Sequence, residues 1–495
     1  MLLFFLKLLI TFISTGTYFL GTYFFRFFRF FKIFKLFKLF KFLSLQDFFP
    51  LWKLALPLVL SGLLESSLGL TNTLFLSKLG PEDLAAGALV IWFFATLMVI
   101  VWGVFTGISV LVSHQFGAEN TKAIASILRD AVFLSLLLTI PLFFLIWNLG
   151  AVFILLGQSE QMVLKAEPYM HALAFSVLPD LVGLSFMQFL IGLGKTKTNL
   201  IFSLSWVPLN IFLNYVLVFG ALGFPHLGMA GLGWGACLAY WITSLGLGLY
   251  LFLHPAYEKY IQALNLFSRV KYLWDLIKVG LPMGLMYSLE IGYFFTLSLM
   301  MAKLGLDEID GNQIALQYLG FLSTFSFAMA QAITVRMGHA LGAKNPAIAN
   351  RAACAGILTA MSLMTVVFLI YLFLPSLLIS FDFNLNNLNQ THHANLITQA
   401  TKFLALMGLF QLIESARLTL FGALRAYKDT RFTLISSVFC FWGLALPLGY
   451  FFAHHEFLYL NFGSGSYWLC ASFGALVNVF LLSLRYKFLK KKYQK

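Results

Sequence analysis

Long apolar runs, separated by short polar breaks, recur along the chain from about residue 50 onward. Each run holds about 20 residues or more, which as an α-helix crosses roughly 30 Å of hydrocarbon. The runs lack the apolar/polar alternation of a membrane β-barrel strand, and a helix satisfies its own backbone hydrogen bonds in lipid. The pattern predicts twelve transmembrane helices, to within several residues at each end, over 51–76, 84–110, 130–149, 168–193, 199–220, 230–253, 275–302, 312–335, 352–380, 400–424, 432–453 and 465–485.

The composition excludes a soluble globular protein. Of the 495 residues, 60% are hydrophobic and 11% are charged, so a water-soluble fold could not bury the apolar surface. The lipid bilayer is therefore the solvent of this chain, and the predicted fold class is an all-α polytopic membrane protein. The four cysteines stand singly in apolar runs without CxxC spacing, which indicates small core residues rather than ligands or disulfides: Cys237, Cys354, Cys440 and Cys470.

The positive charge follows the connections between the predicted helices. A formal net charge of +14 could indicate a nucleic-acid partner, but the cations sit at segment ends and in short loops, so no nucleic acid is expected. Alternate connections are basic, such as the one with Lys195 and Lys197, whereas an intervening one carries Glu82 and Asp83. By the positive-inside rule, the basic loops and both termini of this multi-pass protein lie in the cytoplasm.

Residues 1–50 form a basic and aromatic N-terminal extension that does not fit this scheme. Its apolar start runs into cations that recur every three residues between Arg26 and Lys41, a spacing that winds them around all faces of a helix. Three interpretations remain open: an interfacial or thirteenth helix, a targeting segment, or a low-complexity segment ahead of the functional protein. We favour the interpretations in which the extension is dispensable.

The remaining chain contains an internal repeat. Shifted by 225 positions, the first predicted span aligns with the seventh without a gap, and His114 falls on His339 in the next basic connection. An offset of 234 carries Asp180 to Glu414 and continues to the sixth span. The identities at the first offset include Lys53, Leu56, Pro57, Leu60, Leu64, Glu65, Thr71, Leu74, Lys78, Leu79 and Gly80, matched from Lys278 to Gly305.

A repeat of six helices places both copies in the same orientation, related by an axis along the membrane normal. We therefore expect two pseudo-symmetric six-helix lobes, 51–255 and 275–486, around a central cavity, with a cytoplasmic linker at 256–274 and a basic tail at 487–495. Two such lobes can rock between inward and outward openings. This makes secondary transport the leading functional class.

Four carboxylates lie inside predicted spans, where a charge costs about 2.5 to 3.5 kcal/mol even on insertion scales. The repeat makes them two equivalent pairs, Glu65 with Asp180 and Glu290 with Glu414. Such a pair could take up a proton, bind Na⁺ through its oxygens, or attract a cationic organic substrate. Glu290 has no basic residue nearby in the sequence, whereas Arg417 lies three residues after Glu414 and could neutralise it.

Further polar groups lie in the same spans. Asn210 and Asn214 are one helical turn apart and could offer oxygens to a cation, although hydrogen bonding between helices is the commoner role. Tyr287, one turn before Glu290, is a candidate for lining a substrate cavity, although most aromatic residues in such a protein only pack.

The motifs resemble those of the MATE (multidrug and toxic compound extrusion) family, most closely its NorM-like branch, over roughly residues 50–485. No single motif is specific, but their order, spacing and repetition are. The residues that carry the resemblance are Leu56-Pro57 through Thr73, Gly107 through Ala118, Gly192-Leu-Gly-Lys-Thr-Lys197, Pro208-Leu-Asn210 through Tyr215, Pro282 through Glu290, Arg336 through Gly342 and Leu424 through Thr430.

The resemblance implies an antiporter that exports cationic, amphipathic drugs or dyes in exchange for Na⁺ or H⁺, with no other cofactor. It also implies that Glu290 and Glu414 hold the coupling cation, with Glu414 in place of the usual Asp. In the first lobe the family's acid is replaced by Asn72, which cannot take up a proton. Asn72, Asn210 and Asn214 could still assemble a neutral, oxygen-rich patch.

Two rival functions would leave different signals in the sequence. A lipid-linked precursor flippase of a related two-lobed fold would need a basic cavity, whereas the intramembrane charges here are mainly acidic. An intramembrane enzyme would need clustered acids or metal ligands such as DDxxD or HExxH, which the sequence does not contain. We therefore expect a transporter that is not an enzyme, and a monomer.

Overall fold

The computed structural model describes residues 44–265, 268–375, 390–454 and 463–494. The chain divides into two compact units, Met1–Pro50 and Leu51–Lys495. Residues 1–43 of the N-terminal extension lie outside the described residues, as does the end of the predicted span 352–380. In the described part every regular element is helical, with no strand.

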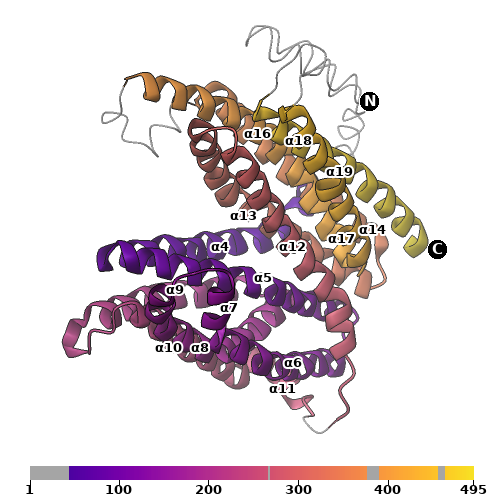
Figure 1. The fold of residues 1–495 in the computed structure, drawn as a ribbon. Helices are drawn as coiled ribbons and strands as arrows, with labels where there is room; N and C mark the ends of the chain where they lie inside the picture. Colours follow the sequence, from indigo (N-terminus) through magenta and orange to yellow (C-terminus); the bar gives the residue numbers. More distant parts are fainter. Residues whose placement is uncertain (1–43, 266–267, 376–389, 455–462, 495) are drawn as a thin grey trace, which may run out of the picture. The chain divides into compact units, whose positions relative to one another are not determined.

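The helices follow the predicted repeat. We call α4 to α11 the first half and α12 to α19 the second half (Figure 1). The first half contains α4 (Leu45–Leu79), α5 (Pro81–Gly117), α6 (Thr121–Trp147), α7 (Leu149–Leu155), α8 (Glu160–Gly192), α9 (Thr196–Phe219), η2 (Ala221–Gly223), α10 (Met229–Leu253), η3 (Pro255–Tyr257) and α11 (Glu258–Gln262). The second contains α12 (Leu273–Ala302), α13 (Leu306–Gly342), α14 (Pro346–Phe373), α16 (Gln390–Ala426), α17 (Thr430–Val438), the π-helical η5 (Phe439–Ala445), α18 (Leu446–His454) and α19 (Gly465–Gln494).

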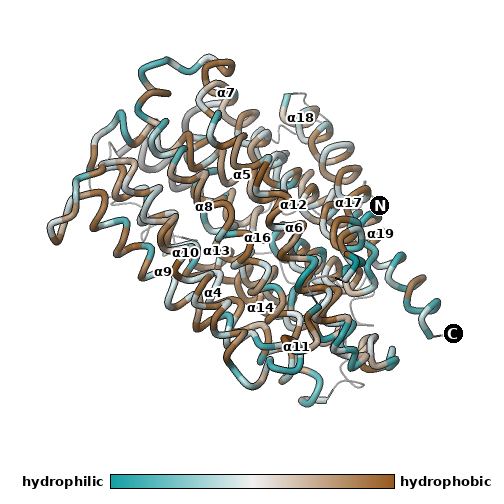
Figure 2. Tube along the Cα trace, turned by 90° about the horizontal axis from the view of Figure 1, so that it is seen from below, coloured by the Kyte–Doolittle hydropathy of each residue, from teal (hydrophilic) through white to brown (hydrophobic). Residues whose placement is uncertain are grey.

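Twelve helices in the described part are long and apolar enough to cross a membrane, which confirms the predicted number of spans. The eleventh is built from α17, η5 and α18 in succession. Figure 2 shows brown, hydrophobic colour along the helices and teal colour at α11 and at the C-terminal end of α19. The polar positions therefore gather at connections and helix ends, as the sequence pattern predicts.

Several helices extend beyond the predicted boundaries. The third begins at Thr121 rather than 130, because the Asn120 side chain accepts a hydrogen bond from the Ala123 amide (3.1 Å) and caps the helix. Asn345 caps the ninth in the same way, by accepting from the Ile348 amide (3.1 Å). The second and eighth spans also run on, to Gly117 and Gly342, because their polar last turns stay helical.

Each half is organised around one central helix. In the first half α8 packs against α5, α6 and α10, and in the second α16 packs against α13, α14 and α19. These two helices are the most buried of the twelve candidate spans. Since α8 and α16 carry Asp180 and Glu414, each half places one of its acids on its central helix.

The two halves meet where α5 contacts α12 and α13. Glycines allow this approach, because a Cβ atom on Gly280 would lie 2.0 Å from the Val104 carbonyl oxygen, and one on Gly284 would lie 2.1 Å from that of Ile100. The contact lies toward the end of the helices at which α5 finishes and α12 begins. This end carries the basic connections, and we call it the basic end.

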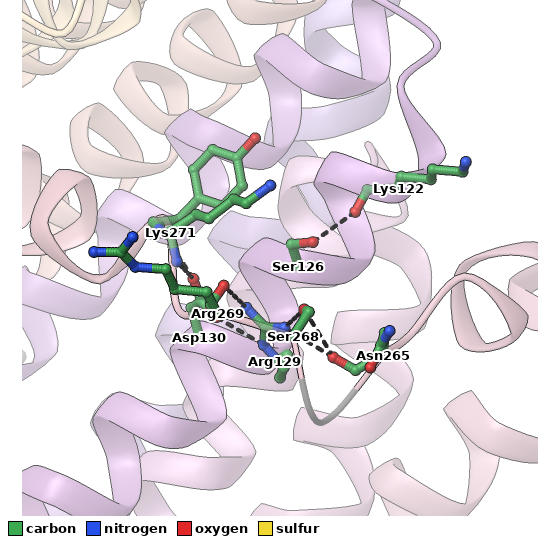
Figure 3. A network of polar contacts seen from close by, with 9 residues as sticks. Lys122, Ser126, Arg129, Asp130, Asn265, Ser268, Arg269 and Lys271 are labelled. Atoms are coloured by element: carbon green, nitrogen blue, oxygen red, sulfur yellow. Dashed lines mark hydrogen bonds and ion pairs between the residues drawn. The ribbon is translucent and has the colours of Figure 1, made fainter.

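The connection between the halves is fastened to the first half (Figure 3). Buried Arg129 and Asp130 on α6 form an ion pair (2.6 Å), and Arg129 also donates to the Asn265 and Arg269 carbonyl oxygens. Asp130 accepts the backbone N–H groups of Lys271 (2.9 Å) and Tyr272 (2.7 Å), directly ahead of α12. A residue of the first half thus fixes the backbone directly ahead of the first helix of the second.

This network explains why the third span was predicted too short. Arg129 and Asp130 look like a membrane boundary in the sequence, but their charges compensate each other inside the protein. Burial also raises the pKa of Tyr272 in the same connection, so its phenol stays neutral.

We expect Gly280→Ala to lower thermal stability in detergent, because the new methyl group must displace the Val104 backbone; overpacking of this kind costs about 1 to 3 kcal/mol. The control is Gly246→Ala on α10, where a Cβ meets nothing within 4 Å. Equal melting temperatures for the two variants would contradict the close approach of α5 and α12.

We expect Asp130→Asn to speed trypsin cleavage after Arg269 and Lys271, because the loss of a buried partner costs about 3 to 5 kcal/mol and releases the connection. Asp429→Asn is the matched control, since its pair with Arg485 (2.6 Å) is partly exposed and worth at most about 1 kcal/mol. An unchanged cleavage rate in Asp130→Asn would show that this network does not hold the connection.

Candidate functional site

Glu290 and Glu414 come together in the second half through Arg417. Glu414 is buried and receives two hydrogen bonds from Arg417, from Nε (2.7 Å) and from Nη2. The same Nη2 lies 2.9 Å from Glu290 Oε1, so one guanidinium joins α12 to α16. The structure therefore brings together the two acids that the sequence analysis paired, with a cation between them.

Arg417 is itself held firmly. Its Nη1 donates to Ser437 Oγ (3.3 Å), and its guanidinium lies over the Phe441 ring, 5.1 Å from the centroid. With Arg417 and both glutamates ionised, the cluster carries one net negative charge. Hydrogen bonds stabilise this charge only in part, because buried Glu290 Oε2 has no hydrogen-bond partner in the described structure.

Glu290 has no basic residue nearby in the sequence, but the fold brings one to it. Arg417 is far from Glu290 along the chain and reaches it only because α12 packs beside the α16–α17 region. The interpretation of Arg417 as a same-face partner of Glu414 is correct, since the two form an i, i+3 ion pair. One arginine serves both acids.

In the described part of the chain, no cation pairs with the equivalent acids of the first half. Glu65 on α4 accepts a hydrogen bond from Ser203 Oγ (3.2 Å), and Asp180 on α8 accepts one from Trp102 Nε1 (3.2 Å). The two charges are close enough to influence each other. Asp180 is buried, whereas Glu65 is exposed at the protein surface.

The repeat explains this difference between the halves. The offset of 234 that relates Asp180 to Glu414 also relates Ser203 to Ser437, so each acid pair has a serine at the same place. At the same offset, Arg417 corresponds to Gly183, which has no side chain to offer. The first half therefore keeps two uncompensated acids where the second half has a shared arginine.

The three asparagines named from the sequence form one chain of hydrogen bonds between α4 and α9. Asn214 Nδ2 donates to Asn72 Oδ1 (3.1 Å) and to Asn210 Oδ1 (2.9 Å). Asn210 and Asn214 are buried, and Asn214 Oδ1 packs against Gly235 without a hydrogen-bond partner in the described part. The structure thus assembles the neutral, oxygen-rich patch that the sequence suggested.

Tyr287 lies beside a second buried arginine of the second half, Arg425. Its hydroxyl accepts from Arg425 Nη1 (3.4 Å), and its ring packs edge-on against Phe421 and Phe327. Arg425 is buried and also donates from Nε to Thr334 Oγ1 (2.9 Å). Tyr287 therefore has a structural partner that the sequence analysis did not foresee.

The sequence analysis also missed a polar contact between the halves. Gln331 on α13 donates to Ser109 Oγ on α5 (2.8 Å) and to Gln188 Oε1 on α8 (3.4 Å). Neither glutamine carries a charge or belongs to a repeated motif, so the sequence offers no signal for this contact. It adds a polar side-chain link between the halves beside the close glycine contacts of α5 and α12.

The comparison with known proteins covers both halves. The family model described as MatE matches residues 57–216 and 282–451. The chain is 29% identical to the "Probable multidrug resistance protein NorM" of Burkholderia mallei over 404 residues, 81% of this chain and 85% of that protein. It is 26% identical to the protein of the same name from Brucella suis over 444 residues, 88% of this chain and 92% of that one.

Solved structures have the same fold. A MATE structure in the straight conformation superposes with a TM-score of 0.77 at 19% identity, covering 90% of this chain and 96% of that one. The eukaryotic MATE transporter AtDTX14 gives a TM-score of 0.75 at 18% identity, covering 91% of this chain and 98% of that one. Because the family model matches both halves and more than half of the chain, this protein belongs to the MatE family.

Proposed function

We propose that this protein is a secondary active multidrug efflux antiporter that exports cationic, amphipathic compounds in exchange for Na⁺ or H⁺ by alternating access. The carrying observation is the cluster of Glu290, Arg417 and Glu414, in which two carboxyl groups share one guanidinium inside a membrane-spanning bundle. Relatives named as multidrug resistance proteins support the substrate class. Both halves are present in one chain, so a monomer suffices.

We place the basic end in the cytoplasm of a bacterial inner membrane. An even number of spans puts the start of the first span and the end of α19 at this same end, together with the basic connections. In this orientation both termini are cytoplasmic. The lobes of the proposal are 51–255 and 275–486, which lie within the first and second halves.

Arg417 gives the cluster a built-in competitor for the coupling ion. A proton or Na⁺ that binds Glu290 removes the charge that attracts Arg417, and so loosens the link between α12 and α16. Na⁺ would take oxygen ligands from Glu290 and Glu414. Ion binding promotes a conformational change only if the ion binds one opening more tightly than the other.

An organic cation and the coupling ion would compete for the same negative charge. A bound drug is released when the ion neutralises Glu290, and the next drug displaces the ion from the opposite side. The intramembrane acid pairs of both halves disfavour an anionic lipid-linked substrate. Tyr287 remains our candidate for contact with the drug.

Glu65 and Asp180 are the second candidate for coupling. The observation that favours them is the glycine at position 183, which leaves this pair without a cation. Asn72, Asn210 and Asn214 cannot exchange a proton, so they would contribute only neutral oxygen ligands. The two candidates are separable by one pair of variants.

We expect Glu290→Gln to reduce drug-driven H⁺ or Na⁺ flux in proteoliposomes by about tenfold or more, since a hydrogen bond to a charged group is worth about 1.5 to 3 kcal/mol. The matched variant Glu65→Gln should keep most of the flux. Imposing Na⁺ and pH gradients separately identifies the ion. Full flux in Glu290→Gln, with loss in Glu65→Gln, would move the coupling site to the first half.

We expect Arg417→Met to lower the free energy of unfolding by about 3 to 5 kcal/mol, because buried Glu414 and half-buried Glu290 lose their shared partner. Adding Glu414→Gln should recover much of the loss, since it removes one of those charges. The measurement is thermal unfolding of the purified protein in detergent. A double variant no more stable than Arg417→Met alone would mean that charge compensation is not what Arg417 supplies.

A further inference from the structure

Two histidines cross between the halves at the basic end. His114 lies in the last turn of α5, and its Nε2 is 2.7 Å from the carbonyl oxygen of Ala426, the last residue of α16. His339 lies in the last turn of α13, and its Nε2 is 2.8 Å from the carbonyl oxygen of Gly192, the last residue of α8. A carbonyl oxygen only accepts, so Nε2–H donates in both bonds.

The two bonds are copies of each other. The offset of 225 that relates α4 to α12 also relates His114 to His339. The offset of 234 that relates Asp180 to Glu414 also relates Gly192 to Ala426. Each half therefore extends one histidine to the same position on the other half's central helix, and the exchange is reciprocal.

The accepting carbonyls belong to helix ends, where the last four carbonyl groups lack an intrahelical partner. After α8, the backbone N–H groups of residues 193–195 bond to residues 189–191 and pass over Gly192. After α16, those of residues 427–429 bond to Leu424 and Arg425 and pass over Ala426. Each of these two carbonyl groups, which its own helix end leaves without a backbone donor, accepts a hydrogen bond from the histidine of the opposite half.

Backbone contact surrounds both bonds. A Cβ atom on Gly117 would lie 2.0 Å from the His339 carbonyl oxygen, and one on Gly342 would lie 2.0 Å from the His114 carbonyl oxygen. The His339 ring also packs against Phe116, with 4.7 Å between centroids. The ends of α5 and α13 are thus closed against each other, and any opening between the halves at this end must break both bonds.

We propose that His114 and His339 are paired gating residues, which hold the basic end of the transporter closed and must release their carbonyls before it opens. This inference rests on the proposed alternating access. It assigns to the histidines a positioning role in the transport cycle that is separate from the acid clusters within each half. Because the bonds are equivalent, their loss should act equally and multiplicatively on the equilibrium between closed and open states.

A cysteine at position 110 can report this opening. Val110 is fully buried and packs in a cluster between the halves with Val279, Met283, Met286 and Phe421. The Val110→Cys side chain is slightly smaller than valine, and its thiol becomes accessible to a reagent when α5 leaves this cluster. The native Cys237, Cys440 and Cys470 are buried, so they stay unlabelled as long as the protein is folded. Cys354 is half-buried, and the protein without Val110→Cys gives its background labelling.

The test is labelling of Val110→Cys with a membrane-impermeant maleimide in inside-out vesicles, without drug or ion gradient. We expect His114→Ala and His339→Ala each to speed labelling about two- to tenfold, the usual worth of one hydrogen bond, and the double variant to multiply the two effects. His114→Gln and His339→Gln, which keep an N–H donor, should restore slow labelling. His171→Ala is the control, since His171 stacks on Trp147 within the first half.

Unchanged labelling in both alanine variants overturns the proposal. If an alanine variant also exposes Cys237 or Cys470, the shorter amides of His114→Asn and His339→Asn replace it, and unchanged labelling in these is equally decisive. Faster labelling of the alanine variants, with no drug efflux by the unsubstituted protein, would instead reject the proposed transport function and leave the gate proposal intact. Normal efflux with unchanged labelling would reject the gate alone.

Discussion

The structure depends on one constraint: hydrocarbon offers no hydrogen-bond partner, so each polar group in a span must find one inside the protein. The helices satisfy most of the backbone, and the remaining groups account for the features described above. Buried Arg129 is compensated by Asp130, and buried Glu414 by Arg417. The carbonyl groups at the ends of α8 and α16 are satisfied by histidines from the opposite half. Polar side chains therefore define where the helices of the two halves join.

The two halves share the same helix arrangement and many of the same contacts, but they differ in the charged and polar side chains of their acid pairs. Central helices, asparagine caps, glycine approaches and the two histidine bonds occur once in each half. The acid pairs occupy equivalent places, yet only the second contains an arginine, because Arg417 stands opposite Gly183. The asparagine chain around Asn214 belongs to the first half. The repeat thus supplies the scaffold, and single substitutions give the halves different electrostatics.

Most of the fold could be predicted from the sequence, because apolar runs and repeated polar residues are local signals. The number of spans and the acid pairs came from these signals. Charges compensated inside the protein were harder to predict: Asp130 looked like a membrane boundary, and the sequence around Glu290 does not show that Arg417 reaches it in space. The last turns of α5 and α13 were left outside the predicted spans, so the contacts of His114 and His339 were missed. Packing between distant segments is what the periodicity could not supply.

Helix α12 of the second half is bonded to both halves. The backbone directly ahead of its first turn is anchored by Asp130 of the first half, and farther along Glu290 is tied by Arg417 to the core of the second. Pro282 lies between these two anchors and lacks the N–H group that would donate to the Lys278 carbonyl, so the hydrogen-bond ladder of α12 is interrupted there. The helix is therefore tied to a different half on each side of this interruption.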